Sequence, residues 1–195
     1  MSFFKLLGTG VALALSDQEI RNSLIDIGKK GLTKINTMLD TDRDGDIDND
    51  DLENIKNYVY NLSSILGHAA LADEKIEDVE EEKAFELIEK LIFSENGILP
   101  QESISSLNIN KKDLKKSIEN HFKSPLPLKK VSKYAIENQI EEEYYEYACT
   151  IVSSDTTIAQ DEKNFLEEFS KLLELSNIDK KMIEKKYRIC KEHVS

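Results

Sequence analysis

The chain has little glycine and proline: 7 Gly and 3 Pro among its 195 residues, where the two together average about 12%. Because these residues mark most turns, their scarcity argues against a sandwich or barrel of many short strands. The two cysteines, Cys149 and Cys190, are too few for a disulfide-stapled scaffold and have neither metal-ligand nor redox spacing. No run of about 18 apolar residues occurs, so we expect no membrane-spanning segment.

Basic residues are in the minority, with 26 Lys and Arg against 38 Asp and Glu and a net charge of −12. An acidic surface repels a phosphate backbone and attracts small cations, so we expect a divalent cation as partner and no nucleic acid. Residues 111–133 are the exception, with eight lysines against two acids, a local charge of +6. This stretch is either a helix face docked on acidic parts of the same protein or a patch for a membrane or a partner.

Apolar residues recur at helical spacing along most of the chain, which predicts an all-α fold. The expected long helices span, in chain order, residues 16–39, 52–72, 79–93, 131–152, 161–175 and 178–193. Shorter helical pieces are expected before Pro125 and Pro127, which mark an internal break near 124–127 because neither fits inside a helix.

An apolar segment, 1–15, precedes the first expected helix. It contains a single lysine and is interrupted by Gly8 and Gly10. We expect a buried or loosely membrane-touching helix here, with a cleaved secretory signal as the alternative, for which the segment is short. The expected location is therefore cytoplasmic, with peripheral contact to the inner face of the membrane left open.

A twelve-residue acidic loop separates the first two expected helices and reads Asp40-Thr-Asp-Arg-Asp-Gly-Asp-Ile-Asp-Asn-Asp-Asp51. Gly45 supplies a sharp turn at the sixth position, where a positive φ suits glycine alone. A hard cation needs about six to eight oxygen ligands, and this spacing wraps side-chain and carbonyl oxygens around one point. A solvated acidic turn is the alternative, but it leaves the mutual repulsion of the aspartates unexplained. The predicted ligands are Asp40, Asp42, Asp44, Asp46 (through its carbonyl), Asp48 and Asp51.

This loop resembles that of the EF-hand family, and its continuation from Asp51 to Tyr60 is similar to the loop-helix half of dockerin modules. The resemblance implies bound Ca²⁺ in a helix-loop-helix unit over 16–66. Asp51 stands where most EF-hands have a longer Glu that reaches the metal with both oxygens, so Mg²⁺ is also admitted. Only one such loop occurs, whereas EF-hands usually pair, and this favours a structural ion over a switch.

Two further acidic segments, 72–80 and 154–162, align without gaps. Each is expected to close one helix and open the next, with an Asp in the turn and a Glu at the start of the second helix. The two acids either share a cation or act separately, the Asp stabilising the turn and the Glu complementing the helix dipole. The paired residues are Asp73 with Asp155, and Glu80 with Glu162.

These turns make the chain similar to the tellurite-resistance TerB-like family over residues 55–185. The resemblance rests on Ala69-Ala-Leu-Ala-Asp73 in the first half and on Cys149-Thr-Ile-Val-Ser-Ser-Asp155 and Asp161-Glu-Lys163 in the second. It implies a helical bundle of two pseudo-repeated halves over 55–195, which shares the exit helix of the acidic loop. It also implies a role in tellurite resistance or stress response, with Asp73, Glu80, Asp155 and Glu162 as metal ligands.

No catalytic centre assembles in the sequence, so we expect no enzyme. The three histidines, His68, His121 and His193, lie on separate segments. The leading hypothesis is a non-enzymatic, calcium-binding helical protein of the TerB-like kind. The alternative is a calcium-dependent protein-protein interaction module that uses the acidic loop and its exit helix. A metal-dependent hydrolase is disfavoured, because no His or nucleophile accompanies the acidic turns.

Overall fold

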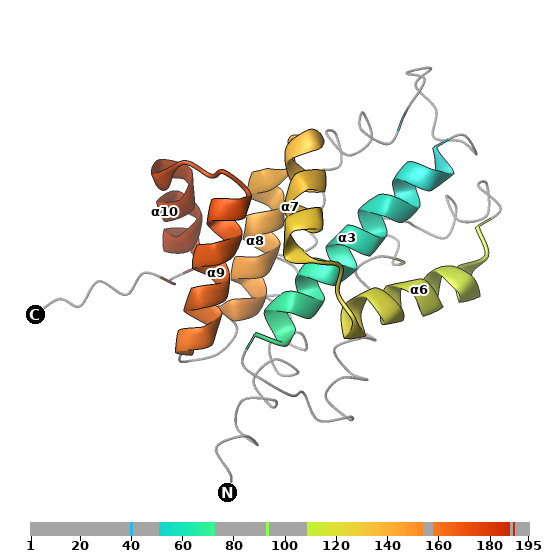
Figure 1. The fold of residues 1–195 in the computed structure, drawn as a ribbon, viewed down its shortest axis with the longest axis horizontal. Coiled ribbons are helices and arrows are strands. Elements are labelled where there is room, and N and C mark those ends of the chain that lie inside the picture. Colours follow the sequence, from blue (N-terminus) through green and yellow to red (C-terminus); the bar gives the residue numbers. More distant parts are fainter. Residues whose placement is uncertain are drawn as a thin grey trace, which may run out of the picture.

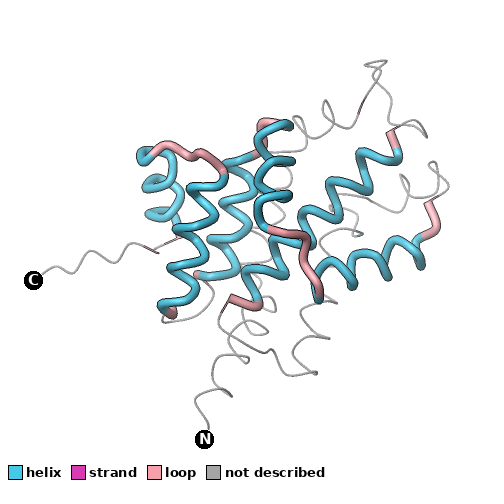
Figure 2. Tube along the Cα trace, viewed as in Figure 1, coloured by secondary structure: helices cyan, strands magenta, loops and turns pink. Residues whose placement is uncertain are grey.

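The computed structural model describes residues 40, 51–72, 93, 109–153, 158–187 and 189. Within these residues every regular element is an α-helix and no strand occurs, so the all-α expectation is confirmed (Figure 2). The helices are α3 (Leu52–Ala70), α6 (Lys111–Lys123), α7 (Leu128–Glu137), α8 (Glu141–Val152), α9 (Gln160–Leu172) and α10 (Asn177–Lys186). The segment 1–15 and the expected helices over 16–39 and 79–93 lie outside the described residues, apart from Phe93, which is helical.

Helix α3 runs through the middle of the described structure (Figure 1). It packs against α6 on one side and against α7 and α8 on the other. Helix α8 in turn contacts α7, α9 and α10, so the four C-terminal helices stand side by side. The core therefore lies around α3 and α8. Helices α6 and α7 contact α3, and helices α9 and α10 contact α8.

The apolar face expected on the 52–72 helix is buried, as Ile55, Val59 and Leu66 illustrate. From Asn61 onward the opposite face is buried too, apart from the half-buried His68, which the amphipathic pattern did not predict. Its polar side chains bond within the helix: the Ser63 hydroxyl donates to the Val59 carbonyl at 2.7 Å, and the Ser64 hydroxyl donates to the carbonyl four residues back at 2.8 Å. Such internal bonds remove the cost of burying a hydroxyl, so α3 can be a central helix.

A single glycine lets α3 approach the end of α6. A Cβ atom at Gly67 would lie 2.3 Å from the carbonyl oxygen of Phe122 and 3.0 Å from Cγ of Pro125. No real Cβ comes so close to a backbone oxygen, so any side chain here would push the two helices apart. Gly67 thus serves backbone-to-backbone packing.

The proline break at 124–127 separates α6 from α7, as predicted, and it is held against α3. The Leu126 N–H donates to Ser64 Oγ at 3.1 Å, and His68 Nε2 lies 2.8 Å from the Leu126 carbonyl oxygen. Since a carbonyl can only accept, Nε2 is the protonated nitrogen of His68. Both polar groups of one linker residue are therefore bound by α3, which fixes the path between α6 and α7.

The prediction of one helix over 131–152 is wrong, because the chain turns between α7 and α8. Gln139 adopts a left-handed φ of 58°, and the Ile140 N–H donates back to the Ala135 carbonyl at 3.0 Å. This is the usual way to end a helix, but glycine normally occupies the left-handed position. With glutamine there, the sequence carries no glycine signal for the stop.

A left-handed residue also ends α9 earlier than the sequence predicts. Helix α9 ends at Leu172, before the expected end at 175, because Glu174 has a φ of 56° and the Leu175 N–H returns to the Ser170 carbonyl at 3.1 Å. Helix α10 ends at Lys186 instead of continuing to 193, and Ile189 is not helical.

Candidate metal centre

The twelfth residue of the acidic loop lies buried at the start of α3. Asp51 is only 2% exposed, and its carbonyl accepts from the Ile55 N–H at 3.0 Å. An Asp in this place ordinarily caps the helix by accepting from a backbone N–H two or three residues on. Asp51 makes no such bond, and its own backbone is helical, with φ −87° and ψ −9°. Its carboxylate is therefore withdrawn from bulk water without serving as the cap of α3.

The first residue of the loop is also partly shielded. Asp40 is half-buried, and its Oδ1 atom is out of contact with solvent. The two described ends of the loop thus both hold carboxylate oxygen away from water. Burial of an ionised carboxylate is costly unless cations or hydrogen-bond donors compensate for the lost hydration.

The other predicted ligands of the loop, Asp42, Asp44, Asp46 and Asp48, lie outside the described residues, as does Gly45. The calcium loop as a whole therefore stays a prediction. Within the part of the chain that the structure describes, no group of three or more His, Cys, Asp or Glu side chains could hold a metal ion.

One member of the paired acidic turns is described, and it supports its own helix. Glu162 is buried, and its Oε2 accepts from the Ala159 backbone N–H at 2.6 Å at the start of α9. This is one half of a capping box, a local bond that satisfies a backbone donor at the helix start. It matches the alternative in which the Glu stabilises the second helix. Asp73, Glu80 and Asp155 lie outside the described residues, so a metal role for these turns stays a prediction.

The described histidines have structural partners. His68 holds the linker, as above, and Nδ1 of His121 lies 2.7 Å from the Ser117 carbonyl within α6. The His121 ring also stacks on Tyr60, with ring centroids 4.5 Å apart. Cys149 is a buried cysteine of α8 that forms no disulfide with any described residue. His193 and Cys190 lie outside the described residues.

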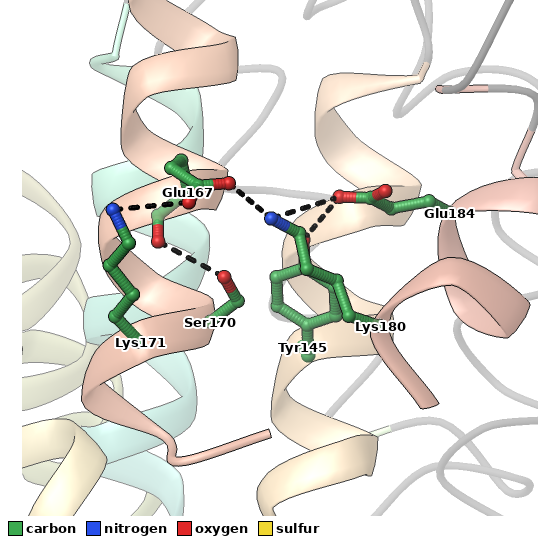
Figure 3. Close-up of polar contacts among 6 residues, drawn as sticks. All are labelled: Tyr145, Glu167, Ser170, Lys171, Lys180 and Glu184. Carbon is green, nitrogen blue, oxygen red and sulfur yellow. Dashed lines mark hydrogen bonds and ion pairs between the residues drawn. The ribbon is translucent and has the colours of Figure 1, made fainter. Parts of the chain in front are cut away.

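A polar cluster that joins α8, α9 and α10 was not predicted from the sequence (Figure 3). The buried Tyr145 hydroxyl donates to Glu184 Oε1 at 2.8 Å, and Lys180 Nζ lies 3.8 Å from the same oxygen. Lys180 also donates to Glu167, which pairs with Lys171 at 3.1 Å. The hydrogen bonds from Lys180 and Lys171 lower the pKa of the Glu167 carboxyl.

A second contact ties α10 to α8. Lys186 Nζ lies 2.7 Å from Glu146 Oε1. Desolvation opposes the charge on Lys186, but its hydrogen bonds to Glu146 and Tyr187 outweigh this, so the pKa of the ammonium group is raised. Lys180 and Lys186 of α10 thus bind carboxylates of α9 and α8, and these bonds hold α10 against its neighbours. No sequence pattern could locate these bonds, because the residues that make them come from three separate helices.

Tyrosines that are buried, or half-buried in the case of Tyr134, lie between α3, α7 and α8. The ring of Tyr144 lies 6.1 Å from that of Tyr58 and 6.3 Å from that of Tyr134, centroid to centroid. Burial raises the pKa of each of these phenols above its ordinary value, and that of Tyr147 beside them. The raised pKa keeps each of these phenols protonated at ordinary pH.

A scan of protein-family models finds no match to this chain, and searches of the curated proteins and of the solved structures find none. In the described part of the chain, no helix is both long enough and apolar enough to cross a membrane.

Proposed function

We propose that this chain is a non-enzymatic calcium-binding helical protein, in which one Ca²⁺ held by the loop 40–51 fixes the start of α3. The observation that carries the proposal is the ligand spacing of the loop 40–51, whose twelfth residue, Asp51, is only 2% exposed at the start of α3. A divalent cation is the partner that a loop with seven aspartates and one arginine would require. Mg²⁺ is the other hard cation that such oxygen ligands accept.

The position of Asp51 decides what the ion would do. Asp51 immediately precedes α3, and α3 is the helix against which α6, α7 and α8 pack. Asp51 is bonded directly to Leu52, the first residue of α3, so a cation bound by Asp51 would be held next to the central helix. Bound Ca²⁺ would therefore stabilise the whole helical body, because a ligand that binds only the folded state adds its binding free energy to stability.

The burial of α3 also favours a structural ion over a calcium-dependent docking helix. From Tyr58 to Ala70 every residue of α3 except Tyr60 and His68 is buried by the protein itself. A partner could occupy this stretch only after α6, α7 or α8 had moved away. The likeness to TerB-like proteins extends the proposal to a role in tellurite resistance or stress response.

The test is calorimetric titration of the chelator-treated protein with Ca²⁺, followed by thermal unfolding with and without the ion. At a concentration of about 100 times the dissociation constant, Ca²⁺ is expected to add about 2.7 kcal/mol of stability. Asp51→Asn keeps the shape of the side chain but removes its charge. It should abolish most of the gain from Ca²⁺, and thermal unfolding of the metal-free variant measures what the carboxylate contributes without the ion.

Asp113→Asn is the matched control. Asp113 lies in the first turn of α6, is exposed, and loses the same charge on substitution. This variant should respond to Ca²⁺ like the original protein. The proposal fails if no heat is released at about millimolar ion, well above the range of known sensor sites, and Asp40→Ala leaves thermal stability unchanged.

A further inference from the structure

The lysine-rich stretch 111–133 forms α6, the linker and the first half of α7. Some of its lysines are engaged by their own helix: Lys123 lies 2.9 Å from Glu119, and Lys133 lies 3.5 Å from Glu137. Lys111 lies over the ring of Phe93, with Nζ 5.1 Å from its centroid. The engaged lysines therefore account for only part of the local charge.

Lys115 is half-buried, with Nζ 5.9 Å from the centroid of the Phe93 ring. The other four lysines are exposed and make no ion pair with any residue of the described part: Lys112 and Lys116 on α6, and Lys129 and Lys130 on α7. We call these four the basic surface. The alternative was that this stretch docks onto acidic parts of the same protein, and these four lysines make no such contact with the described residues. They are available to something outside the chain.

The fold presents the basic surface rigidly. Helix α6 buries Leu114, Ile118 and Phe122, so Lys112 and Lys116 stand on the side away from the core. Helix α7 buries Val131 and Ala135, and Lys129 and Lys130 likewise lie off that face. The clamp of Ser64 and His68 on Leu126 holds the two helices in one arrangement, so the four charges are not on a loose tail.

The chemistry of the basic surface favours an anionic lipid surface over a protein or a nucleic acid. The cores of protein interfaces are enriched in aromatic residues and depleted in lysine, and no large apolar side chain of α6 or α7 is exposed. Phosphate recognition in nucleic acids leans on the two-pronged contacts of arginine, and residues 111–133 contain none. Clusters of about four to eight Lys or Arg on an amphipathic helix are typical of segments that bind anionic lipids such as phosphatidylserine.

The remainder of the chain, which carries −18, limits how the protein could approach such a membrane. At physiological salt, charges more than about 8 Å apart are largely screened from one another. Acidic residues that lie farther than this from the four lysines therefore weaken the attraction of these lysines to a membrane only a little. We infer that the basic surface, Lys112, Lys116, Lys129 and Lys130, binds membranes that contain anionic lipid. This inference does not depend on the calcium proposal.

The experiment is sedimentation of the full chain with vesicles of phosphatidylcholine that contain about 30% phosphatidylserine, or none. A chelator is present throughout, because Ca²⁺ could bridge acidic protein and anionic lipid by itself. The test variant is Lys116→Gln/Lys129→Gln/Lys130→Gln. The control is Lys163→Gln/Lys181→Gln/Lys185→Gln, which removes three exposed lysines from α9 and α10 and lowers the net charge equally.

The unaltered chain should bind only the vesicles with phosphatidylserine, and added salt should release it, because about 1 M salt shortens the screening distance to about 3 Å. Each lysine near such a surface contributes about fivefold in affinity, so the test variant should lose about a hundredfold and the control little. Circular dichroism in the same chelator-containing buffer verifies that the unaltered chain and both variants are folded.

Three results would overturn the inference. The first is no binding of the unaltered chain to phosphatidylserine vesicles in low salt. The second is an equal loss in the control, which would place any contact on α9 and α10 or on net charge alone. The third is retention by polyglutamate or duplex DNA without retention by vesicles, which would assign the basic surface to an acidic protein or to a nucleic acid.

Discussion

Two adjacent tyrosines of α8 provide a sharp test of the interior. Tyr144 and Tyr145 are both fully buried, and both phenols have a raised pKa through burial. They differ in their hydroxyl groups. Tyr145 donates to the Glu184 carboxylate at 2.8 Å, whereas the Tyr144 hydroxyl has no hydrogen-bond partner among the described residues. Replacement by Phe removes the same atom from each.

The expected effects follow from that difference. A hydrogen bond to a charged group contributes about 1.5–3 kcal/mol, so Tyr145→Phe should lower the free energy of unfolding by about 2 kcal/mol. Tyr144→Phe removes a buried hydroxyl that has no bond to lose, so its effect should stay within about 0.5 kcal/mol or be stabilising. Lys180 still faces Glu184 in both variants, so the carboxylate is not left without a cation.

Urea unfolding followed by far-ultraviolet circular dichroism measures both variants, since the chain has no tryptophan. With a slope of about 2 kcal/mol per molar urea, Tyr145→Phe should shift the midpoint by about 1 M. A double-mutant cycle with Glu184→Ala should recover most of the effect as coupling between the two residues. Equal losses in Tyr144→Phe and Tyr145→Phe, or no coupling in the cycle, would refute the role assigned to this hydrogen bond.

Two other predictions concern packing and pH. Gly67→Ala would ordinarily strengthen a helix by up to about 1 kcal/mol, but here the new Cβ would lie 2.3 Å from the Phe122 carbonyl oxygen. We therefore expect the free energy of unfolding to fall by about 2 kcal/mol in the urea experiment. A more stable variant would contradict the backbone contact. The buried tyrosines have raised pKa values in the folded chain, so their contribution is intact below the unfolded value of about 10 and declines as pH rises above it. Tyrosinate absorbance should therefore appear together with loss of helical ellipticity in an alkaline titration, and its full appearance before unfolding would contradict this. The residues concerned are Tyr58, Tyr134, Tyr144, Tyr145 and Tyr147.

The helix predictions succeeded where a local signal exists. Apolar spacing placed α3 correctly, and Pro125 and Pro127 marked the boundary between α6 and α7. They were wrong at Gln139 and Glu174, which adopt left-handed backbone conformations without being glycine. A residue of that kind is held there by the bonds and packing of the finished turn, and composition alone does not reveal it.

The candidate metal site was also predicted from residues that are close together in the sequence. The twelve-residue pattern defines the ligand positions because consecutive residues of one loop surround the ion. The structure adds that Asp51 is buried at the start of the central helix, and that Glu162 bonds to the backbone of its own helix. Burial of these carboxylates depends on the packing of other helices, so it could not be inferred from the loop.

By itself, the sequence determined the helical class of the protein, the break at 124–127 and the positions of the acidic loop and the basic stretch. Each of these follows from residues that are neighbours in the chain. Only the tertiary structure decided that α3 is buried on nearly all sides from Tyr58 to Ala70, that Leu126 is clamped by Ser64 and His68, and that α10 is docked through Tyr145, Glu184 and Lys180. The contacts of Leu126 with α3 and of Tyr145 with Glu184 join residues about 40 to 60 positions apart. Their energy comes from burial and close contact, which exist only once the helices have packed.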